Sequence, residues 1–378
     1  FDDHLDHFKS VAVEVLSERD PIFDIDVDDR DGARSKGVAL KHSDHIRTGI
    51  CETLALLGSH PKALTSTTHG KPDYIAAMTV REVLSTEDWS VWATLNHVLP
   101  LLAEAAPTHF LDAVENFLST DSKLFLRIFE QEGCGPIFGQ TYISGLLWAI
   151  ETLAWSPDYL TRAIVALGGL ATIDPGGTWG NRPANSIRTI LLPWLPQTCA
   201  DNEGRVAAVR ALIREYPKVG WEALLKLLPE GQSSSSHTRR PAWREYIPNT
   251  WTERVTNKEY LDQVEQYADI AVEISKQNVG KVSDMIERFG NLTPTARETL
   301  LVFLVSNDFQ AADEDVRAKV WDALSDLIVR HKKFADTDWA LPEELCLRLS
   351  RILDLIAPSS AQRRYQRLFT ENDFFLIE

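Results

Sequence analysis

Two short segments of this sequence combine tryptophan with arginine, the residue types that dominate binding hot spots of proteins. Each side chain brings a large contact area together with directed hydrogen bonds, so the combination is typical of a protein-binding surface. The candidate partner-binding residues are Trp179, Asn181 and Arg182 in TWGNRP, and Arg239, Arg240, Trp243 and Arg244 in TRRPAWREY. The alternative is structural: the tryptophans would fill the core, and the arginines would cap helix C-termini or pair with surplus acidic residues.

Two pairs of histidines stand three residues apart, His4 with His7 in HLDH and His42 with His45 in HSDH. On a helix this spacing places both imidazoles on one face. A zinc site on a helix normally uses HExxH spacing and a further ligand downstream, which neither segment supplies. The pattern therefore predicts solvated or helix-capping histidines and no bound metal.

The sequence offers little material for catalysis. Cys134 lies between two glycines in EGCGP, an arrangement that can expose a thiolate, but no histidine lies close in the sequence to activate it. The phosphate-binding motifs GxxxxGK[ST] and GxGxxG are absent, and DPGGTWGNRP lacks the strand-to-helix context that both require. We therefore expect a tight turn at Cys134, no catalytic residue and no cofactor, so the chain by itself is not expected to be an enzyme.

These candidate residues lie in a chain dominated by amphipathic helical patterns, including one unit that occurs three times. In each copy an apolar-periodic helix ends at a proline and a second helix begins at once, around Pro107, Pro157 and Pro217. A proline costs little in the first turn of a helix, because its missing N–H has no partner there. Apolar residues at matching distances after each proline predict a buried stripe: Ala113, Val114 and Phe117; Ala163, Ile164 and Leu167; Ala223, Leu224 and Leu227.

Helical hairpins repeated in this way bury their apolar stripes by stacking on one another. The pattern predicts an all-α fold, an irregular α-solenoid of stacked helical hairpins similar to HEAT or TPR arrays, continuous over residues 1–378. Within it we distinguish a repeat region at 1–230, a projecting loop at 231–256 and a C-terminal helical region at 257–378. The loop is too long and too polar for an ordinary helix connection, so we expect residues 232–238 to be exposed and Trp243 to anchor its return.

Composition and charge exclude several classes of protein. Hydrophobic residues make up 44% and charged residues 25% of the chain, which is ordinary for a folded protein. No apolar run approaches the roughly 20 residues that span a bilayer, so no membrane partner is expected. A net charge of -16 and a pI near 5.1 disfavour nucleic-acid binding, which depends on lysine and arginine.

Two further features bear on the origin of the chain. The four cysteines, Cys51, Cys134, Cys199 and Cys346, lie far apart without a CxxC pair, which favours free thiols in the cytoplasm. The sequence begins at Phe1 inside an acidic helical pattern and lacks a secretory signal there. We therefore expect a cytoplasmic piece of a longer polypeptide.

Several segments resemble parts of large bacterial multidomain proteins in which a STAND-type signal-transduction NTPase precedes a long helical array. The segments are LAWSPDYLTRAIVALGGLATIDPGGTWGNRPANSIRTILLPWLPQT, VGWEALLKLLP and SSSSHTRRPAWREY, and the resemblance covers most of residues 1–250. In that family the helical array is the sensor of antiphage defence: it recognises a viral protein and licenses NTPase-driven oligomerisation and an N-terminal effector. The resemblance implies a sensor or scaffold fragment without activity of its own.

Three functions remain open at this point. The leading hypothesis is a helical-repeat module that binds a protein partner, such as a phage protein. The alternative is a HEAT-like nucleic-acid-processing enzyme, for example a DNA glycosylase, which would need a basic concave face and a catalytic carboxylate; the net charge counts against it. The third is a purely structural spacer.

Overall fold

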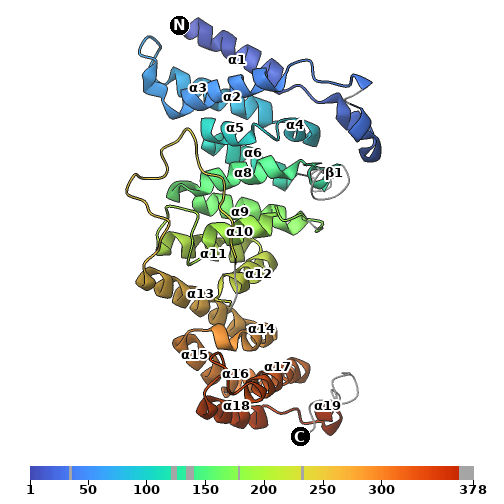
Figure 1. Cartoon of the computed structure of the whole chain (residues 1–378), viewed down its shortest axis with the longest axis vertical. Coiled ribbons are helices and arrows are strands. Elements are labelled where there is room, and N and C mark those ends of the chain that lie inside the picture. The colour runs from blue at the N-terminus through green and yellow to red at the C-terminus, as the bar shows by residue number, and fades with distance from the viewer. Residues whose placement is uncertain (34–35, 121–125, 133–139, 178, 231–233, 366–378) are drawn as a thin grey trace. The chain divides into compact units, whose positions relative to one another are not determined.

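The computed structural model describes residues 1–33, 36–120, 126–132, 140–177, 179–230 and 234–365 (Figure 1). The chain forms two compact units. Unit 1 comprises residues 1–223 and 234–256, and unit 2 comprises residues 224–233 and 257–378. The division therefore lies at 223/224 instead of 230, and most of the segment expected to project belongs to unit 1.

Unit 1 is built from helices joined mainly by short connections. Its α-helices are α1 (Asp2–Leu16), α2 (Asp44–Ser59), α3 (Lys71–Leu84), α4 (Trp89–Thr94), α5 (Leu99–Ala105), α6 (Pro107–Ser119), α8 (Ile143–Ala154), α9 (Pro157–Ile173), α10 (Pro183–Leu191), α11 (Asn202–Glu215) and the start of α12 (Pro217–Leu227). Its 3-10 turns are η1 (Pro21–Asp24), η2 (Val27–Gly32), η4 (Pro61–Ala63) and η5 (Arg127–Phe129). Two antiparallel strands, β1 (Gln131–Glu132) and β2 (Gln140–Thr141), pair Gln131 with Thr141 and Glu132 with Gln140.

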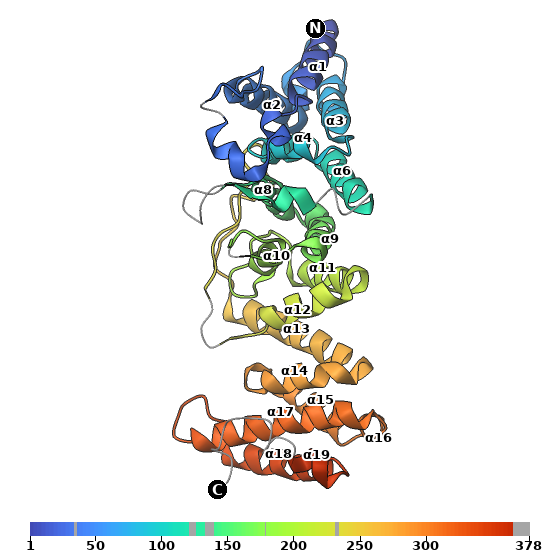
Figure 2. The same cartoon turned by 90° about the vertical axis from the view of Figure 1, so that its right-hand side faces the viewer.

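The helices of unit 1 stack in two rows. In one row α2 packs against α5, α5 against α8 and α8 against α10. In the other row α3 packs against α6, α6 against α9 and α9 against α11, and these four helices follow one another along one side in Figure 2. Successive helices of the chain, such as α5 with α6 and α8 with α9, connect the rows. This is the stacking of helical hairpins that the repeated pattern predicts, and the all-α prediction is confirmed.

The three repeated prolines lie where the sequence predicts them. Pro107, Pro157 and Pro217 are the first residues of α6, α9 and α12. Seven residues later, Val114, Ile164 and Leu224 are each fully buried. The stripe is thus the face along which each helix packs on its neighbours. Ala113 is the exception, because it is only half-buried.

Glycine allows α2 to approach α5 more closely than any other residue would. A Cβ atom built on Gly58 of α2 would lie 1.9 Å from the carbonyl oxygen of Ala105, the last residue of α5. No side chain can occupy that distance, so the backbones of α2 and α5 are in direct contact at this point. Gly49, earlier on the same helix, has no atom within 4 Å of the corresponding position.

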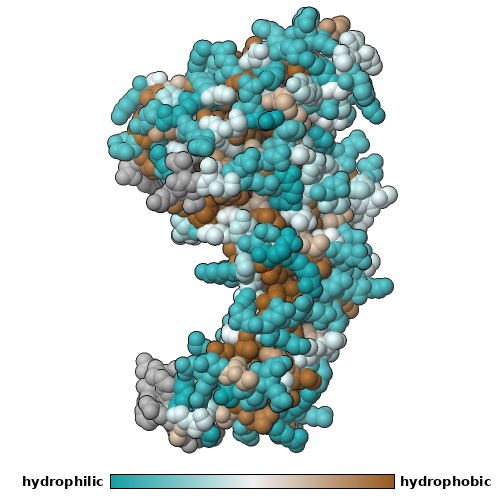
Figure 3. All heavy atoms as spheres, turned by 180° about the vertical axis from the view of Figure 1, so that it is seen from behind, coloured by the Kyte–Doolittle hydropathy of each residue, from teal (hydrophilic) through white to brown (hydrophobic). Residues whose placement is uncertain are grey.

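Unit 2 is also helical in its described part. After the end of α12 its elements are α13 (Asn257–Gln277), η6 (Val279–Lys281), α14 (Val282–Glu287), η7 (Phe289–Asn291), α15 (Pro294–Leu304), α16 (Asn307–Gln310), α17 (Glu314–Lys333), α18 (Glu343–Leu355) and α19 (Ala361–Tyr365). Helix α13 packs against α14 and α15, and α17 packs against α14 and α18. Over the described residues no helix of either unit is both long and apolar enough to cross a membrane. On the face drawn in Figure 3 both units are mostly hydrophilic, with hydrophobic residues visible between the hydrophilic ones.

Candidate protein-binding surface

Residues 234–256, which we call the strap, lie along unit 1 instead of projecting from it. In Figure 1 the strap runs without helix to the level of α5 and returns to the start of α13. At its beginning the Arg188 guanidinium donates to the carbonyl of Ser234 at 3.2 Å, and the amide of Thr238 donates to the Gln197 side chain at 3.4 Å. Thr238 is buried, whereas Ser234, Ser236 and His237 are exposed. The expectation of an exposed loop over 232–238 is therefore wrong at Thr238, while residues 231–233 lie outside the described ranges.

Glu104 holds the far end of the strap. This α5 residue is only 2% exposed, and its carboxylate accepts hydrogen bonds from three successive strap amides. The amide of Ala242 lies 3.0 Å from both carboxylate oxygens, and those of Trp243 and Arg244 lie 2.7 and 2.9 Å from Oε2. A buried carboxylate needs such donors, because without them burial would leave its charge unsolvated. The strap returns at Trp243, as expected, but the contact there is made by its backbone amide and not by its indole.

Arg244 closes the ends of two helices. Its Nε donates to the carbonyl of Glu104 at 2.5 Å, and its Nη2 donates to the carbonyls of Gly58 at 2.9 Å and Ala105 at 3.2 Å. These are carbonyls of the last turns of α2 and α5, which have no partner within their own helices. Arg244 thus caps helix C-termini, which is the structural role considered for these arginines as the alternative to partner binding.

Glu151 of α8 holds the strap at a second point. It is 7% exposed, and it accepts hydrogen bonds from the Ser186 hydroxyl at 2.6 Å and from the Arg239 amide at 3.2 Å. Burial raises the pKa of the Glu151 carboxyl above its ordinary value, and the two hydrogen bonds partly oppose that shift. On the other side of the same strap residue, the Trp155 indole donates to the carbonyl of Arg239 at 3.0 Å. The backbone of Arg239 is therefore fixed at both its N–H and its C=O.

The side chains of Arg239 and Arg240 lie over three tryptophan rings of unit 1, of which Trp148 is exposed, Trp251 half-buried and Trp155 fully buried. The Arg239 guanidinium lies 5.8 Å from the ring centre of Trp148, and that of Arg240 lies 5.4 and 5.3 Å from those of Trp155 and Trp251. Both arginines are exposed, and Trp148 is 39% exposed. We call these five residues the arginine–tryptophan surface. Each cation–π contact stabilises the arrangement by about 0.5–1 kcal/mol at an exposed site.

The two guanidinium groups differ in their other partners. Arg240 forms an ion pair with Glu253 of the strap, in which both side chains are more than 40% exposed. Arg239 has no ion-pair partner among the described residues. In a chain with a net charge of -16, the exposed Arg239 guanidinium forms no ion pair with a described acid, although its charge acts on the buried Glu151 carboxyl and partly opposes the rise that burial causes in the pKa of that group.

The TWGNRP segment forms a separate structure. Arg182 precedes the first turn of α10, forms an ion pair with Asp174 and donates its Nε to the carbonyl of Trp179 at 3.3 Å. These contacts close the loop before α10, and Trp179 and Asn181 are half-buried in it. No hydrogen bond or ring contact in the described part of the chain joins these three residues to Arg239 or Arg240. The structure thus brings together only part of the predicted set.

Sequence reasoning missed the two buried acids that position the strap. A signal was present, because Glu104 in LLAEAA and Glu151 in AIETLA are single acids within strongly apolar helical segments. Residues of this type are almost never fully buried unless they are paired, so an acid on an apolar stripe predicts a distant donor. The sequence does not say which donor.

The residues considered for metal or thiol chemistry do not form a cluster. His42 lies in a contact with Glu18 at 2.9 Å, from its Nδ1 to the carboxylate Oε2. Among the residues that the structure covers, no three His, Cys, Asp or Glu side chains are placed to hold a metal ion. Cys51 is fully buried, and burial raises the pKa of its thiol to about 12. Cys134 lies outside the described residues.

Comparisons with known proteins add no relative. No protein-family model, no curated protein and no solved structure matches this chain.

The raised pKa of Glu151 predicts how stability depends on pH. A raised pKa means that the native state favours the protonated acid. The contribution of Glu151 to the free energy of unfolding is therefore fully present below pH 4.5, the pKa of this group in the unfolded chain, and is lost as the pH rises through the pKa of the folded state. Glu151→Gln keeps a neutral acceptor and donor at this position. We expect the variant to gain stability relative to the natural chain as the pH rises from about 4.5 to 8 in urea melts. The opposite trend would contradict the burial argument.

Proposed function

We propose that this chain is a non-catalytic protein-binding module and that the arginine–tryptophan surface is its partner-binding site. The observation that carries the proposal is the exposed pair of guanidinium groups, Arg239 and Arg240, stacked on tryptophan rings by a strap whose backbone is fixed. A side chain held in place before binding loses little conformational entropy when the partner arrives. Arginine and tryptophan together supply apolar contact area and directed hydrogen bonds, which is how hot spots contribute affinity.

The charge of this surface favours an acidic segment of the partner. Arg239 has its guanidinium over Trp148 and forms no ion pair with a carboxylate of the described chain, so a partner carboxylate can pair with it through two parallel hydrogen bonds. Arg188, which contacts the strap at Ser234, adds a further positive group on the same part of unit 1. Binding of this kind weakens as salt is added, because exposed charges are screened.

The net charge disfavours the alternative. An enzyme of the DNA-glycosylase type would need a basic concave face, whereas the chain has 55 acidic and 39 basic residues. The resemblance described above supports a sensor role: apart from its first serine, the SSSSHTRRPAWREY segment, which resembles STAND-type antiphage proteins, lies in the strap. We therefore propose a phage protein as the partner and a larger bacterial defence NTPase as the protein to which this sensor region belongs.

The test compares capture of partners from phage-infected and uninfected bacterial cells. The bait is the chain with a photo-crosslinking residue in place of Ser236, an exposed strap residue outside this surface, alone or combined with Arg239→Ala and Arg240→Ala. We expect a crosslinked phage protein with the first bait and at least tenfold less with the second, since loss of hot-spot side chains commonly costs about 1.4 kcal/mol or more. The double variant loses three cation–π contacts of about 0.5–1 kcal/mol each, so its free energy of unfolding should fall by about 1.5–3 kcal/mol, and urea melts check that the bait remains folded.

A control variant and a direct measurement complete this experiment. Arg214→Ala removes an exposed guanidinium elsewhere in unit 1. Among the described residues Arg214 forms an ion pair only with its neighbour Glu215, so this variant should crosslink as well as the bait with the natural Arg214. The captured protein is then purified, and its Kd is measured for the natural chain, for the double variant Arg239→Ala, Arg240→Ala and for Arg214→Ala. Equal affinity for the double variant and the natural chain would refute the assignment of this surface.

A further inference from the structure

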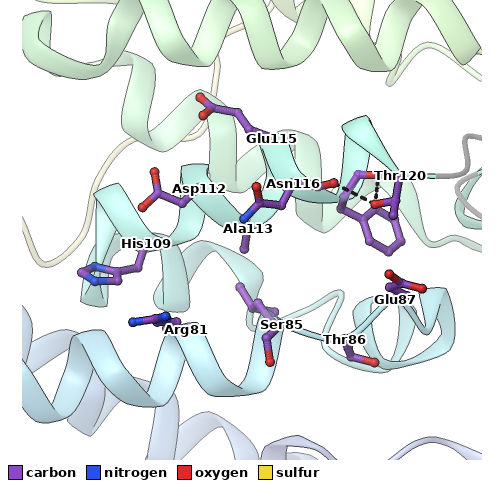
Figure 4. A pocket seen from close by; sticks show the side chains of 12 residues that line it. Arg81, Ser85, Thr86, Glu87, His109, Asp112, Ala113, Glu115, Asn116 and Thr120 are labelled. Atoms are coloured by element: carbon purple, nitrogen blue, oxygen red, sulfur yellow. Dashed lines mark hydrogen bonds between the residues drawn. The ribbon is translucent and has the colours of Figure 1, made fainter.

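A groove between α3 and α6 lies apart from the arginine–tryptophan surface. It has a volume of about 630 Å³ and opens to solvent between the end of α3 and the exposed side of α6 (Figure 4). This volume is within the range of about 300–1,000 Å³ that ligand-binding clefts usually have. No residue of the groove takes part in the surface proposed above.

Small side chains and one arginine keep the groove open. Ala113 of α6 and Ser85 after α3 line its middle, which is why Ala113 is only half-buried although it stands at a stripe position. Arg162 of α9 draws two acids of α6 away from α3: it lies 2.7 Å from Asp112 and 2.9 Å from Glu115. Figure 4 shows Glu115 directed away from α3. The charges of both acids are thus neutralised by α9.

Four polar side chains in the groove have no partner of their own. The Arg81 guanidinium, the His109 imidazole, the Asn116 carboxamide and the Glu87 carboxylate make no hydrogen bond or ion pair with any described residue. In Figure 4 the acid among them, Glu87, lies at the end of the groove away from Arg81 and His109. Figure 4 shows Arg81 and His109 at the same end of the groove, with Asn116 on α6 between the two helices. An exposed arginine without a carboxylate is notable in a chain that has 55 acidic and 39 basic residues.

We propose that this groove is a second binding site and that it takes an extended peptide segment with an aspartate or glutamate side chain. The carboxylate pairs with the planar fork of Arg81, beside His109. The Asn116 carboxamide offers donors and an acceptor, the combination that pairs with a backbone peptide group. The proposal rests on the proposed function, protein binding, and adds a separate site and a ligand class to it.

The probe is a library of random heptapeptides displayed on phage particles and selected on the full chain. We expect the selected peptides to share an acidic residue at one position. One selected peptide is synthesised with a fluorescent label and its Kd measured by anisotropy. Arg81→Gln and Asn116→Ala should each weaken binding by about tenfold, since both remove a contact to the ligand. A peptide in which the acidic residue is replaced by its amide should bind the natural chain about tenfold more weakly than the selected peptide. The same replacement should change the affinity for Arg81→Gln by less than twofold.

Two controls separate this site from the first surface and from unfolding. Arg214→Gln and the double variant Arg239→Ala, Arg240→Ala should bind the peptide within twofold of the natural chain. Thermal melts check that the groove variants remain folded. The inference is overturned if no peptide is enriched, if no acidic position emerges, or if Arg81→Gln binds as tightly as the natural chain. If the double variant alone loses the peptide, the groove proposal fails and the arginine–tryptophan surface stands.

Discussion

Replacing Glu104 by leucine is expected to lower the free energy of unfolding by about 3 kcal/mol. The carboxylate is the acceptor for the amides of Ala242, Trp243 and Arg244, and each hydrogen bond to a charged group contributes about 1.5–3 kcal/mol. The expected loss is smaller than the sum of the three, because a detached strap lets water pair with the freed amides. Leucine fits an apolar helix but offers no acceptor. Either the three amides remain unpaired or the end of the strap leaves α5, and both outcomes remove stability.

Two measurements distinguish these outcomes. Urea melts give the total loss of stability, and hydrogen exchange at residues 242–244 reports whether the strap has detached. Glu104→Gln is the control, because its carboxamide keeps one oxygen acceptor, and it should lose less stability than the leucine variant. A leucine variant that melts within about 0.5 kcal/mol of the natural chain, with protected amides, would show that Glu104 does not hold the strap.

Gly58→Ala should be nearly as damaging, with an expected loss of about 3 kcal/mol. The added Cβ would lie 1.9 Å from the carbonyl oxygen of Ala105, so α2 must move away from α5. That movement also disturbs Arg244, whose Nη2 donates to the carbonyls of both Gly58 and Ala105. The contact is between two backbones, and no rotation of a side chain can relieve it.

Gly49→Ala on the same helix provides a matched control with the opposite sign. No atom lies within 4 Å of its Cβ position, and alanine favours helix over glycine by about 0.5–1 kcal/mol. Urea melts should therefore show Gly49→Ala slightly more stable and Gly58→Ala much less stable than the natural chain. If both substitutions stabilise the protein, then α2 does not approach α5 as closely as the structure shows.

The sequence by itself determined the helices and their repeated hairpins. Pro107, Pro157 and Pro217 begin helices, and Val114, Ile164 and Leu224 lie on buried faces, as predicted. These features could be predicted because their causes are local: a proline fits the first turn of any helix, and helical period alone decides which residues share a face. The candidate site was predictable only in part. Residue types indicated Arg239 and Arg240, but not the tryptophans over which they lie.

Only the tertiary structure decided the path of residues 234–256 and the roles of its arginines. Glu104 and Arg244 stand 140 positions apart in the sequence, yet they meet in the folded chain and turn an expected projecting loop into a strap on unit 1. Local patterns do not specify such a pairing, because a buried carboxylate can be satisfied by any donor that the fold brings to it. Arg244 therefore caps two helices while the Arg239 side chain lies exposed over Trp148, although the sequence presents both as the same residue type in one short segment.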